Sequence, residues 1–312
     1  MKTSAIVFDR PGEVALRQLA LCVPGPADLV VESIASGVST GTEKMLFNGT
    51  MPAFPGMGYP LVPGYESVAR VIEAGPDSGH SPGSLVFVPG ASCYTDAAGL
   101  FGATASRLVV PGNRTHKVGP AIDEDAVLLA LAATAHHAVL RARAPVRLVI
   151  GHGVLGRLIA RMIMALGADA PVVWEVAAAR RDGATGYRVV DPAEDQASRY
   201  QTAIDASGNP AVIDTIVSRL QRPGELVLAG FYGDRVSFAF AAAFMRELTL
   251  SIAAEFRPDD VAAVIALVES GRLSLKDLIT HRAAPGDAST AYRTAFNDPG
   301  CLKMVIDWRK AA

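Results

Sequence analysis

A glycine-rich turn between a short β-branched run and a periodic apolar stretch constrains the fold more than any other feature of this sequence. The run 148–150 (Leu-Val-Ile) leads into the pattern Gly-x-Gly-x-x-Gly, and apolar side chains then recur at helical spacing at Leu158, Ile159, Met162, Ile163 and Leu166. In such a strand–turn–helix unit the first glycine permits a tight turn, the second lets a pyrophosphate approach, and the third packs helix on strand. The pattern predicts a dinucleotide-binding turn at the start of a helix, formed by Gly151, His152, Gly153, Val154, Leu155 and Gly156.

An acidic residue stands where such a turn requires one. Residues 171–175 are expected to form a second strand that ends in Glu175, about 20 residues beyond the turn. Its carboxylate would accept hydrogen bonds from both ribose hydroxyls and repel a 2′-phosphate, which favours NAD over NADP. Arg180 and Arg181 argue against this preference for NAD, since they would bind a 2′-phosphate if the strand ended later. The simpler alternative for the whole motif is a surface turn with an acidic residue nearby by chance. His152, inside the turn, is expected to contact the pyrophosphate, and the alternative is that its side chain faces solvent.

Composition excludes several classes of protein. Half of the 312 residues are hydrophobic and 19% are charged, which suits two folded domains and argues against disorder. The net charge is −2 without a basic tract, so nucleic acid is not expected as a partner. The three cysteines are far apart, which indicates a reducing compartment. With no signal peptide, and with the longest apolar run (126–135) too short for a bilayer, we expect a cytoplasmic protein without a membrane span.

The pattern of apolar residues changes along the chain and predicts an α/β protein. Residues 1–121 contain several short strands separated by glycine and proline, which is typical of a small barrel or sandwich. Residues 122–257 alternate strands and helices, which predicts a doubly wound parallel sheet. Residues 258–312 contain a helix and a final strand, 301–308, which we expect to return to the first domain.

Five motifs together resemble the medium-chain dehydrogenase/reductase superfamily over essentially the whole chain. They are Gly37–Glu43, Pro63–Glu66, the Gly151 turn, Ile204–Gly208 and Gly230–Gly233. The resemblance implies a GroES-like, partly open barrel as catalytic domain beside a Rossmann domain. It also implies that four residues at strand ends flank the nicotinamide: Ser207, Gly208, Gly230 and Phe231.

The zinc ligands of that superfamily are missing from this sequence. The matching positions hold Thr40, Tyr65 and Ala130, whose hydroxyl and methyl groups cannot replace thiolate and imidazole around Zn²⁺. The protein is therefore expected to be zinc-free, with hydroxyl groups handling the proton of the reaction. By resemblance Thr42 contacts the substrate oxygen; Thr40 and Tyr65 are further candidates, and Glu66 would orient these groups. The alternative for Thr40 and Tyr65 is that they merely fill the vacated metal site.

Within the zinc-free branch, the combination of residues 39–43 and 63–66 with a short chain resembles the alcohol dehydrogenases of bacteriochlorophyll synthesis. The resemblance implies that NAD⁺ oxidises a hydroxyethyl side chain of a bacteriochlorophyllide, a magnesium tetrapyrrole, to an acetyl group. A bulky apolar substrate needs a wide cleft, and an apolar stretch beside the expected site would either line it or pack on the barrel or on a neighbouring subunit. Its members are Met45, Leu46, Phe47, Met51, Phe54, Met57 and Tyr59.

Two other functions remain open: a zinc-free quinone or enoyl reductase using NAD(P)H, and a non-catalytic dinucleotide-binding protein. His136 and His137 are adjacent on an expected helix, where helix packing is the simpler role and contact with the cleft or a substrate metal the alternative. Relatives commonly dimerise by pairing edge strands. The alternating segment 235–240 is a candidate strand for such a homodimer.

Overall fold

The chain divides into two compact units in the computed structural model, which describes residues 1–53, 55–120, 122–196, 199–233 and 235–310. Unit 1 consists of Met1–Ala130 and Leu275–Ala312, and unit 2 of Leu131–Ser274. The domain boundaries expected after residues 121 and 257 stay predictions, and residue 121 lies outside the described residues. Helix α6 (Pro258–Glu269) belongs to unit 2. Its Asp260 accepts a hydrogen bond of 2.7 Å from His136 on α2.

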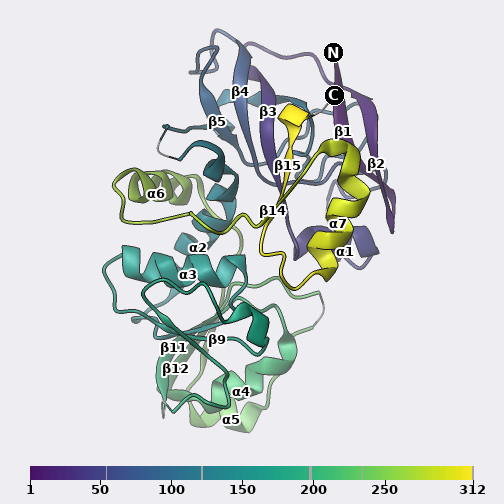
Figure 1. The fold of residues 1–312 in the computed structure, drawn as a ribbon. Coiled ribbons are helices and arrows are strands. Elements are labelled where there is room, and N and C mark those ends of the chain that lie inside the picture. Colours follow the sequence, from purple (N-terminus) through teal and green to yellow (C-terminus); the bar gives the residue numbers. More distant parts are fainter. Residues whose placement is uncertain (54, 121, 197–198, 234, 311–312) are drawn as a thin grey trace. The chain divides into compact units, whose positions relative to one another are not determined.

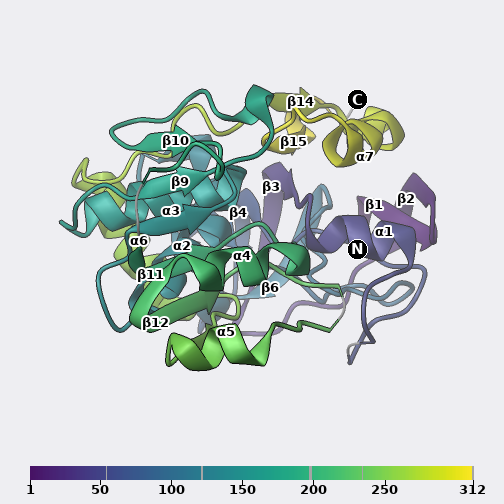
Figure 2. The same ribbon diagram turned by 90° about the horizontal axis from the view of Figure 1, so that it is seen from below.

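Unit 2 is built on one parallel sheet of six strands in the order β10-β9-β8-β11-β12-β13. Numbered along the unit, this order is 3-2-1-4-5-6, which is the order of dinucleotide-binding sheets and confirms the Rossmann prediction. Figure 2 shows β10, β9, β11 and β12 in this succession. The strands are β8 (Leu148–Ile150), β9 (Val172–Trp174), β10 (Arg188–Val190), β11 (Tyr200–Asp205), β12 (Leu220–Leu228) and β13 (Thr249–Ile252).

The helices of unit 2 cover the sheet with the apolar faces that the sequence indicates. Leu158, Ile159, Met162 and Ile163 of α3 are all buried, as their helical spacing predicts, whereas the fifth expected position, Leu166, is exposed where the helix ends. The α-helices before α6 are α2 (Leu129–Arg141, which crosses from unit 1), α3 (Val154–Ala165), α4 (Ile213–Ser218) and α5 (Phe240–Met245). Single 3₁₀ turns lie at Ala178–Arg180 and Pro210–Val212.

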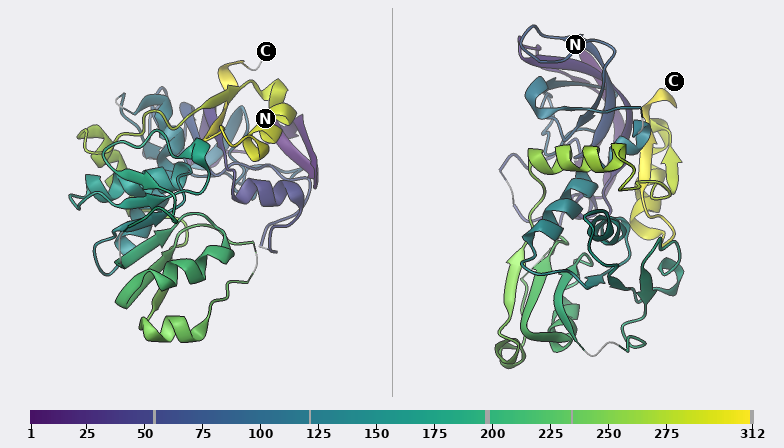
Figure 3. Two further views of the ribbon diagram at one scale, coloured as in Figure 1. Left: turned by 60° about the horizontal axis from the view of Figure 1, so that its bottom comes forward. Right: turned by 90° about the vertical axis from the view of Figure 1, so that its left-hand side faces the viewer.

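The strand expected at residues 235–240 is wrong. Residues 235–239 have no regular structure and lead into helix α5, as the left view of Figure 3 shows. Alternation alone does not make a strand when no neighbouring strand is available to pair with it. The last strand of the sheet is instead β13, whose Leu250 and Ile252 side chains are exposed.

Unit 1 is β-rich, as expected, and is closed by the C-terminal segment. Strands β1 and β2 form an antiparallel pair, and a second sheet runs β14-β15-β3-β4-β5-β7, with β6 also pairing with β3 (Figure 1). Strand β15 pairs antiparallel with β3, which confirms that the chain returns to its first domain. The strands are β1 (Lys2–Arg10), β2 (Glu13–Ala20), β3 (Asp28–Val38), β4 (Ser67–Ala74), β5 (Leu85–Val88), β6 (Arg107–Pro111), β7 (His116–Lys117), β14 (His281–Ala283) and β15 (Met304–Asp307).

Helices α1 (Thr42–Asn48) and α7 (Ala288–Asn297) pack together in the core of unit 1. Helix α7 buries Tyr292 and Phe296 in a core that also contains Leu46 of α1. Four 3₁₀ turns lie at Gly112–Arg114, Asp123–Leu128, Pro285–Asp287 and Trp308–Lys310. Among the described residues, none of the helices has the length and apolar character needed to cross a bilayer.

Candidate active site

The glycine turn of unit 2 has the geometry that a pyrophosphate requires. Gly151 has a φ of +91°, which side-chain-bearing residues rarely adopt, and a Cβ on Gly156 would lie 1.9 Å from the Gly151 carbonyl oxygen. A Cβ on Gly153 would meet no atom within 4 Å, so this side of the turn is open. Val154 and Leu155 begin helix α3, where free N–H groups face the turn. The residues present therefore fit a dinucleotide.

Glu175 follows β9 directly and its carboxylate is held by two backbone groups. Its Oε2 accepts the N–H of His152 at 2.9 Å, and its Oε1 accepts the N–H of Ala177, also at 2.9 Å. Arg181 donates from Nε to the Glu175 carbonyl at 2.8 Å and forms an ion pair with Asp191. The position of Glu175 suits a ribose diol, and the guanidinium of Arg181 is already engaged by protein groups.

The next two strand ends converge, as the sequence indicated. A Cβ on Gly208 would lie 2.8 Å from the Phe231 carbonyl oxygen, and one on Gly230 would lie 2.6 Å from the Gly208 nitrogen. The Ser207 N–H donates to the buried Asp205 carboxylate at 2.8 Å. Burial raises the pKa of Asp205, which also accepts a hydrogen bond from the phenol of Tyr232. Ser207, Gly208, Gly230 and Phe231 thus lie together at the carboxyl ends of β11 and β12, where ligands bind in such sheets.

The sequence predicts that His152 contacts pyrophosphate, and the alternative, a solvent-facing side chain, is wrong. The side chain is fully buried, and both ring nitrogens are hydrogen-bonded, to the Arg180 carbonyl and the Tyr187 phenol. The ring therefore has no free nitrogen for a phosphate, and the backbone N–H and carbonyl of His152 are bonded to Glu175 and Arg157.

Three hydroxyl groups of unit 1 are linked around the start of α1. Thr42 Oγ1 donates to Ser39 Oγ at 3.1 Å, and the Ser39 hydroxyl interacts with the Tyr65 phenol. Burial raises the pKa of Tyr65 well above its usual value, so the phenol is neutral. Thr40 is exposed and makes no side-chain hydrogen bond within the described ranges. The sequence analysis missed Ser39, although it lies three residues before Thr42, the spacing of a helix-start contact.

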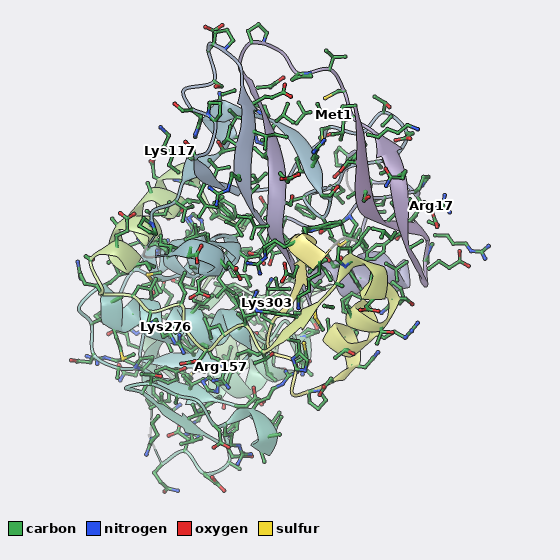
Figure 4. All side chains as sticks on the ribbon, turned by 45° about the horizontal axis from the view of Figure 1, so that its top comes forward. Met1, Arg17, Lys117, Arg157, Lys276 and Lys303 are labelled. Carbon is green, nitrogen blue, oxygen red and sulfur yellow. The ribbon has the colours of Figure 1, made fainter. Side chains whose placement is uncertain are left out.

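Glu66 forms a buried ion pair that the sequence analysis also missed. Lys303 Nζ contacts Glu66 Oε1, both side chains are buried, and the ammonium lies 5.9 Å from the centre of the Tyr65 ring. Figure 4 labels Lys303 just before β15. A Cβ on Gly37 would lie 2.6 Å from Glu66 Oε1 and 2.8 Å from Lys303 Nζ, so a larger residue there would displace the ends of both side chains. A lysine within an otherwise apolar strand pattern was the available signal.

Glu43 is a second buried acid beside this pair. Its Oε1 accepts the Ser39 N–H at 3.1 Å. Burial raises the pKa of Glu43 to about 8, against the opposing effect of the Lys303 charge. Tyr292 of α7 is also buried, and burial together with the nearby Glu43 raises the pKa of its phenol well above the usual value. Tyr292 is another residue that the motifs did not reveal.

The remaining sequence candidates have packing roles. His136 and His137 contact the two oxygens of Asp260, at 2.7 and 3.2 Å, so both join α2 to α6 although they are adjacent in the helix. The described members of the apolar stretch pack in or against the core of unit 1, and Phe54 lies outside the described residues. Within the described ranges no three His, Cys, Asp or Glu side chains are grouped as metal ligands.

Comparisons with known proteins agree with this architecture. Residues 25–120 match the model of the alcohol dehydrogenase GroES-like domain. Two proteins named 2-desacetyl-2-hydroxyethyl bacteriochlorophyllide A dehydrogenase, from Cereibacter sphaeroides and Rhodobacter capsulatus, are each 52% identical to this chain over the full length of both chains. The chain belongs to the medium-chain dehydrogenase/reductase superfamily. It is accordingly an oxidoreductase with a Rossmann sheet and a GroES-like domain.

Solved structures show the same fold at low sequence identity. The 2R,3R-butanediol dehydrogenase of Bacillus subtilis is 17% identical with a TM-score of 0.84, covering 98% of this chain and 99% of that one. An alcohol dehydrogenase from Escherichia coli CFT073 in complex with NADH has 18% identity, the same TM-score and the same coverage. A Sinorhizobium meliloti dehydrogenase of this fold is bound to NADP. The fold alone therefore does not choose between the two dinucleotides.

We predict that Glu43→Gln changes how stability depends on pH. Below pH 4.5 the carboxyl is protonated in both folded and unfolded chains; between 4.5 and about 8 only the unfolded chain ionises, so stability falls as pH rises. The neutral variant lacks this loss. The free energy of unfolding of the variant minus that of the wild type, measured with urea, should increase across this window by at most about 1.4 kcal/mol per pH unit. Glu73→Gln, at an exposed acid of the same unit, serves as control, and a difference independent of pH would contradict the assignment.

We predict that Lys303→Met destabilises unit 1 by about 3–5 kcal/mol, because it removes the cation paired with the buried Glu66 carboxylate. The double variant Lys303→Met/Glu66→Leu should regain much of this stability, since neither charge is then buried. Arg222→Met, which breaks the exposed Arg222–Glu247 pair, is the matched control and should cost less than about 1 kcal/mol. Urea unfolding measures all three. A double variant no more stable than the single one would contradict the ion-pair explanation.

Proposed function

We propose that this protein uses NAD⁺ to oxidise the 3-(1-hydroxyethyl) side chain of a bacteriochlorophyllide to an acetyl group. The observation that carries the proposal is the 52% identity, over the full length of both chains, to two dehydrogenases named for that substrate. Each unit supports it separately, since unit 2 has a dinucleotide turn and unit 1 a group of linked hydroxyls.

The hydroxyl groups of unit 1 would handle the proton of the alcohol. We infer that Thr42 accepts the substrate O–H proton while passing its own to Ser39, the direction in which its hydroxyl already donates. Ser39 in turn releases its own proton to solvent water, so both hydroxyls end neutral and the reaction yields one free proton. Tyr65 would donate a hydrogen bond to the substrate oxygen, because burial keeps its phenol neutral. Glu66, held by Lys303, positions Tyr65 and does not take part in the transfer. A bound nicotinamide supplies the other half of the reaction by accepting hydride from the carbinol carbon.

We propose NAD as the cofactor, without a catalytic zinc. Glu175 supports NAD because a carboxylate beside the ribose repels a 2′-phosphate, and Arg181, which would otherwise favour NADP, is paired with Asp191. Thr40 and Tyr65 at the matching ligand positions support a reaction without zinc. Gly151–Gly156, Glu175 and the strand-end residues Ser207, Gly208, Gly230 and Phe231 would bind the dinucleotide.

We also propose that two copies of the chain form a dimer. Strand β13 leaves one edge of the sheet unpaired and exposes Ile252 (67%), while neighbouring α5 exposes Phe240, Phe244 and Met245. An exposed apolar edge of this kind favours pairing with another strand. Edge-to-edge association of two β13 strands would cover it.

The function is tested by anaerobic incubation of the protein with NAD⁺ and a hydroxyethyl bacteriochlorophyllide. We expect NADH formation together with the absorption shift of a newly conjugated acetyl group, and a lower rate with NADP⁺. Thr42→Val and Tyr65→Phe should each lower kcat by about 10²- to 10³-fold while the dinucleotide Kd stays within about twofold. Intact turnover in both variants would contradict these roles.

The same assay separates the alternatives. Reduction of a quinone or enone with NADPH, and no change in the tetrapyrrole spectrum, would favour the reductase. Dinucleotide binding without turnover of any of these substrates would favour a non-catalytic protein. Chelation that leaves the substrate magnesium in place should not change the rate, and stoichiometric zinc that is required for turnover would contradict the zinc-free proposal.

We predict that Ile252→Lys converts the dimer to a monomer, because it places a charge on the unpaired edge of β13. Light scattering coupled to size exclusion should give the mass of two chains for the wild type and of one chain for the variant. Leu140→Lys, at an exposed leucine of α2, is the control and should remain a dimer. A monomeric wild type would contradict the proposal.

A further inference from the structure

The loop that follows Glu175 cannot be held in place by apolar burial. Between Glu175 and Tyr187, residues 176–186 contribute no buried side chain, and Val176 is 72% exposed. The conformation of this loop must therefore depend on polar contacts. These contacts come from the glycine turn, from helix α3 and from Asp191, whose carboxylate pairs with Arg181 of the loop.

His152 provides the first contact between turn and loop. Burial lowers its pKa to about 4, which keeps the ring neutral at physiological pH. Because the Arg180 carbonyl, 2.6 Å from Nδ1, can only accept, Nδ1 carries the hydrogen, and Nε2 of the neutral ring accepts from the Tyr187 phenol at 2.8 Å. The Tyr187 ring packs edge-on against it at 5.6 Å.

Arg157 of α3, labelled in Figure 4, provides the second contact. It donates from Nε to the His152 carbonyl at 3.1 Å and from Nη2 to the Asp182 carbonyl at 2.7 Å. A Cβ on Gly183 would lie 2.5 Å from Arg157 Nη1, and the φ of Gly183 is +80°, so the loop passes closely over the guanidinium.

The glycine turn and loop 176–186 are both hydrogen-bonded to the Glu175 carboxylate. One carboxylate oxygen accepts the N–H of His152, in the turn, and the other accepts the N–H of Ala177, in the loop. The carboxylate is therefore fixed only while turn and loop stay together. The His152 ring is the side chain of the turn that joins them.

We propose that His152 is a positioning residue for the adenosine ribose: by holding loop 176–186 against the glycine turn, it fixes the Glu175 carboxylate in the orientation that binds the ribose hydroxyls. This role rests on the proposed use of a dinucleotide, and it deepens that proposal. His152 itself need not touch the ligand. Its contribution appears as an affinity specific to the adenosine 2′-hydroxyl.

The test compares ADP-ribose with its 2′-deoxyadenosine counterpart by calorimetry. In the wild type, loss of the 2′-hydroxyl should weaken binding by about tenfold, as expected for a hydrogen bond to a carboxylate. In His152→Leu this difference should shrink to about twofold, because the carboxylate is no longer fixed. Tyr187→Phe, which removes one of the two hydrogen bonds and keeps the ring, should give an intermediate value.

Two further variants separate positioning from general stability. His152→Asn retains a donor for the Arg180 carbonyl and should restore most of the 2′-hydroxyl effect. His136→Asn removes a buried histidine of the same unit that lies on α2 and bonds Asp260, and it should leave the effect unchanged. If His136→Asn reduces the effect as much as His152→Leu does, the positioning role is wrong.

Trypsin cleavage after Arg180 and Arg181 gives a readout that needs no ligand. His152→Leu should be cut in the loop at least about tenfold faster than the wild type, since the fraction of open loop rises when its contacts are lost. Unchanged cleavage together with an unchanged 2′-hydroxyl effect would overturn the inference and leave the proposed function intact. A wild type that binds no dinucleotide would overturn the proposed function and, with it, the role of His152 in ribose binding.

Discussion

The ion pair between Lys303 and Glu66 is the interaction on which the hydroxyl site of unit 1 depends. Both charges are fully buried, and burial of either one alone would be costly. The pair forms only if the loop 63–66 and the C-terminal segment meet, and the absence of a side chain at Gly37 leaves room for it in its present position. The C-terminal segment therefore has two roles when it returns to unit 1: β15 pairs with β3, and Lys303 supplies the positive charge that neutralises Glu66.

The nucleotide unit was predictable because its signals are local. A strand, a turn with glycines at fixed offsets and the first turns of a helix lie within about 20 residues, and each glycine has a steric reason that can be stated from the sequence. Gly156 illustrates this, since its Cβ would overlap the Gly151 carbonyl. The acid at position 175 follows from the same geometry. Alternating strands and helices also predict a doubly wound parallel sheet, whereas its order, 3-2-1-4-5-6, is known only from the structure, because other doubly wound orders fit the same alternation.

The residues that the sequence analysis missed depend on contacts between distant segments. Lys303 and Tyr292 reach the neighbourhood of Glu43 from more than 200 positions away, and no spacing rule connects them. His152 shows a different limit. Its place inside the turn was clear, but the direction of its ring depends on where the loop after Glu175 passes. The segment 235–240 has the alternation of a strand, yet pairing depends on a neighbour that local sequence does not specify.

The charges around the hydroxyl site bear on how a carbonyl-forming reaction would proceed there. The positive charge of Lys303 is paired with Glu66, and burial favours the neutral forms of Glu43 and Tyr65. Such surroundings would stabilise an alkoxide less than a bound dication, because the positive charge of Lys303 is already paired with Glu66. Under the proposed mechanism the proton should therefore leave at the same time as the hydride, through Thr42 and Ser39 to solvent, so that little negative charge builds up on the substrate oxygen. A conjugated product, in which the new carbonyl is stabilised by the ring beside it, suits a site of this kind.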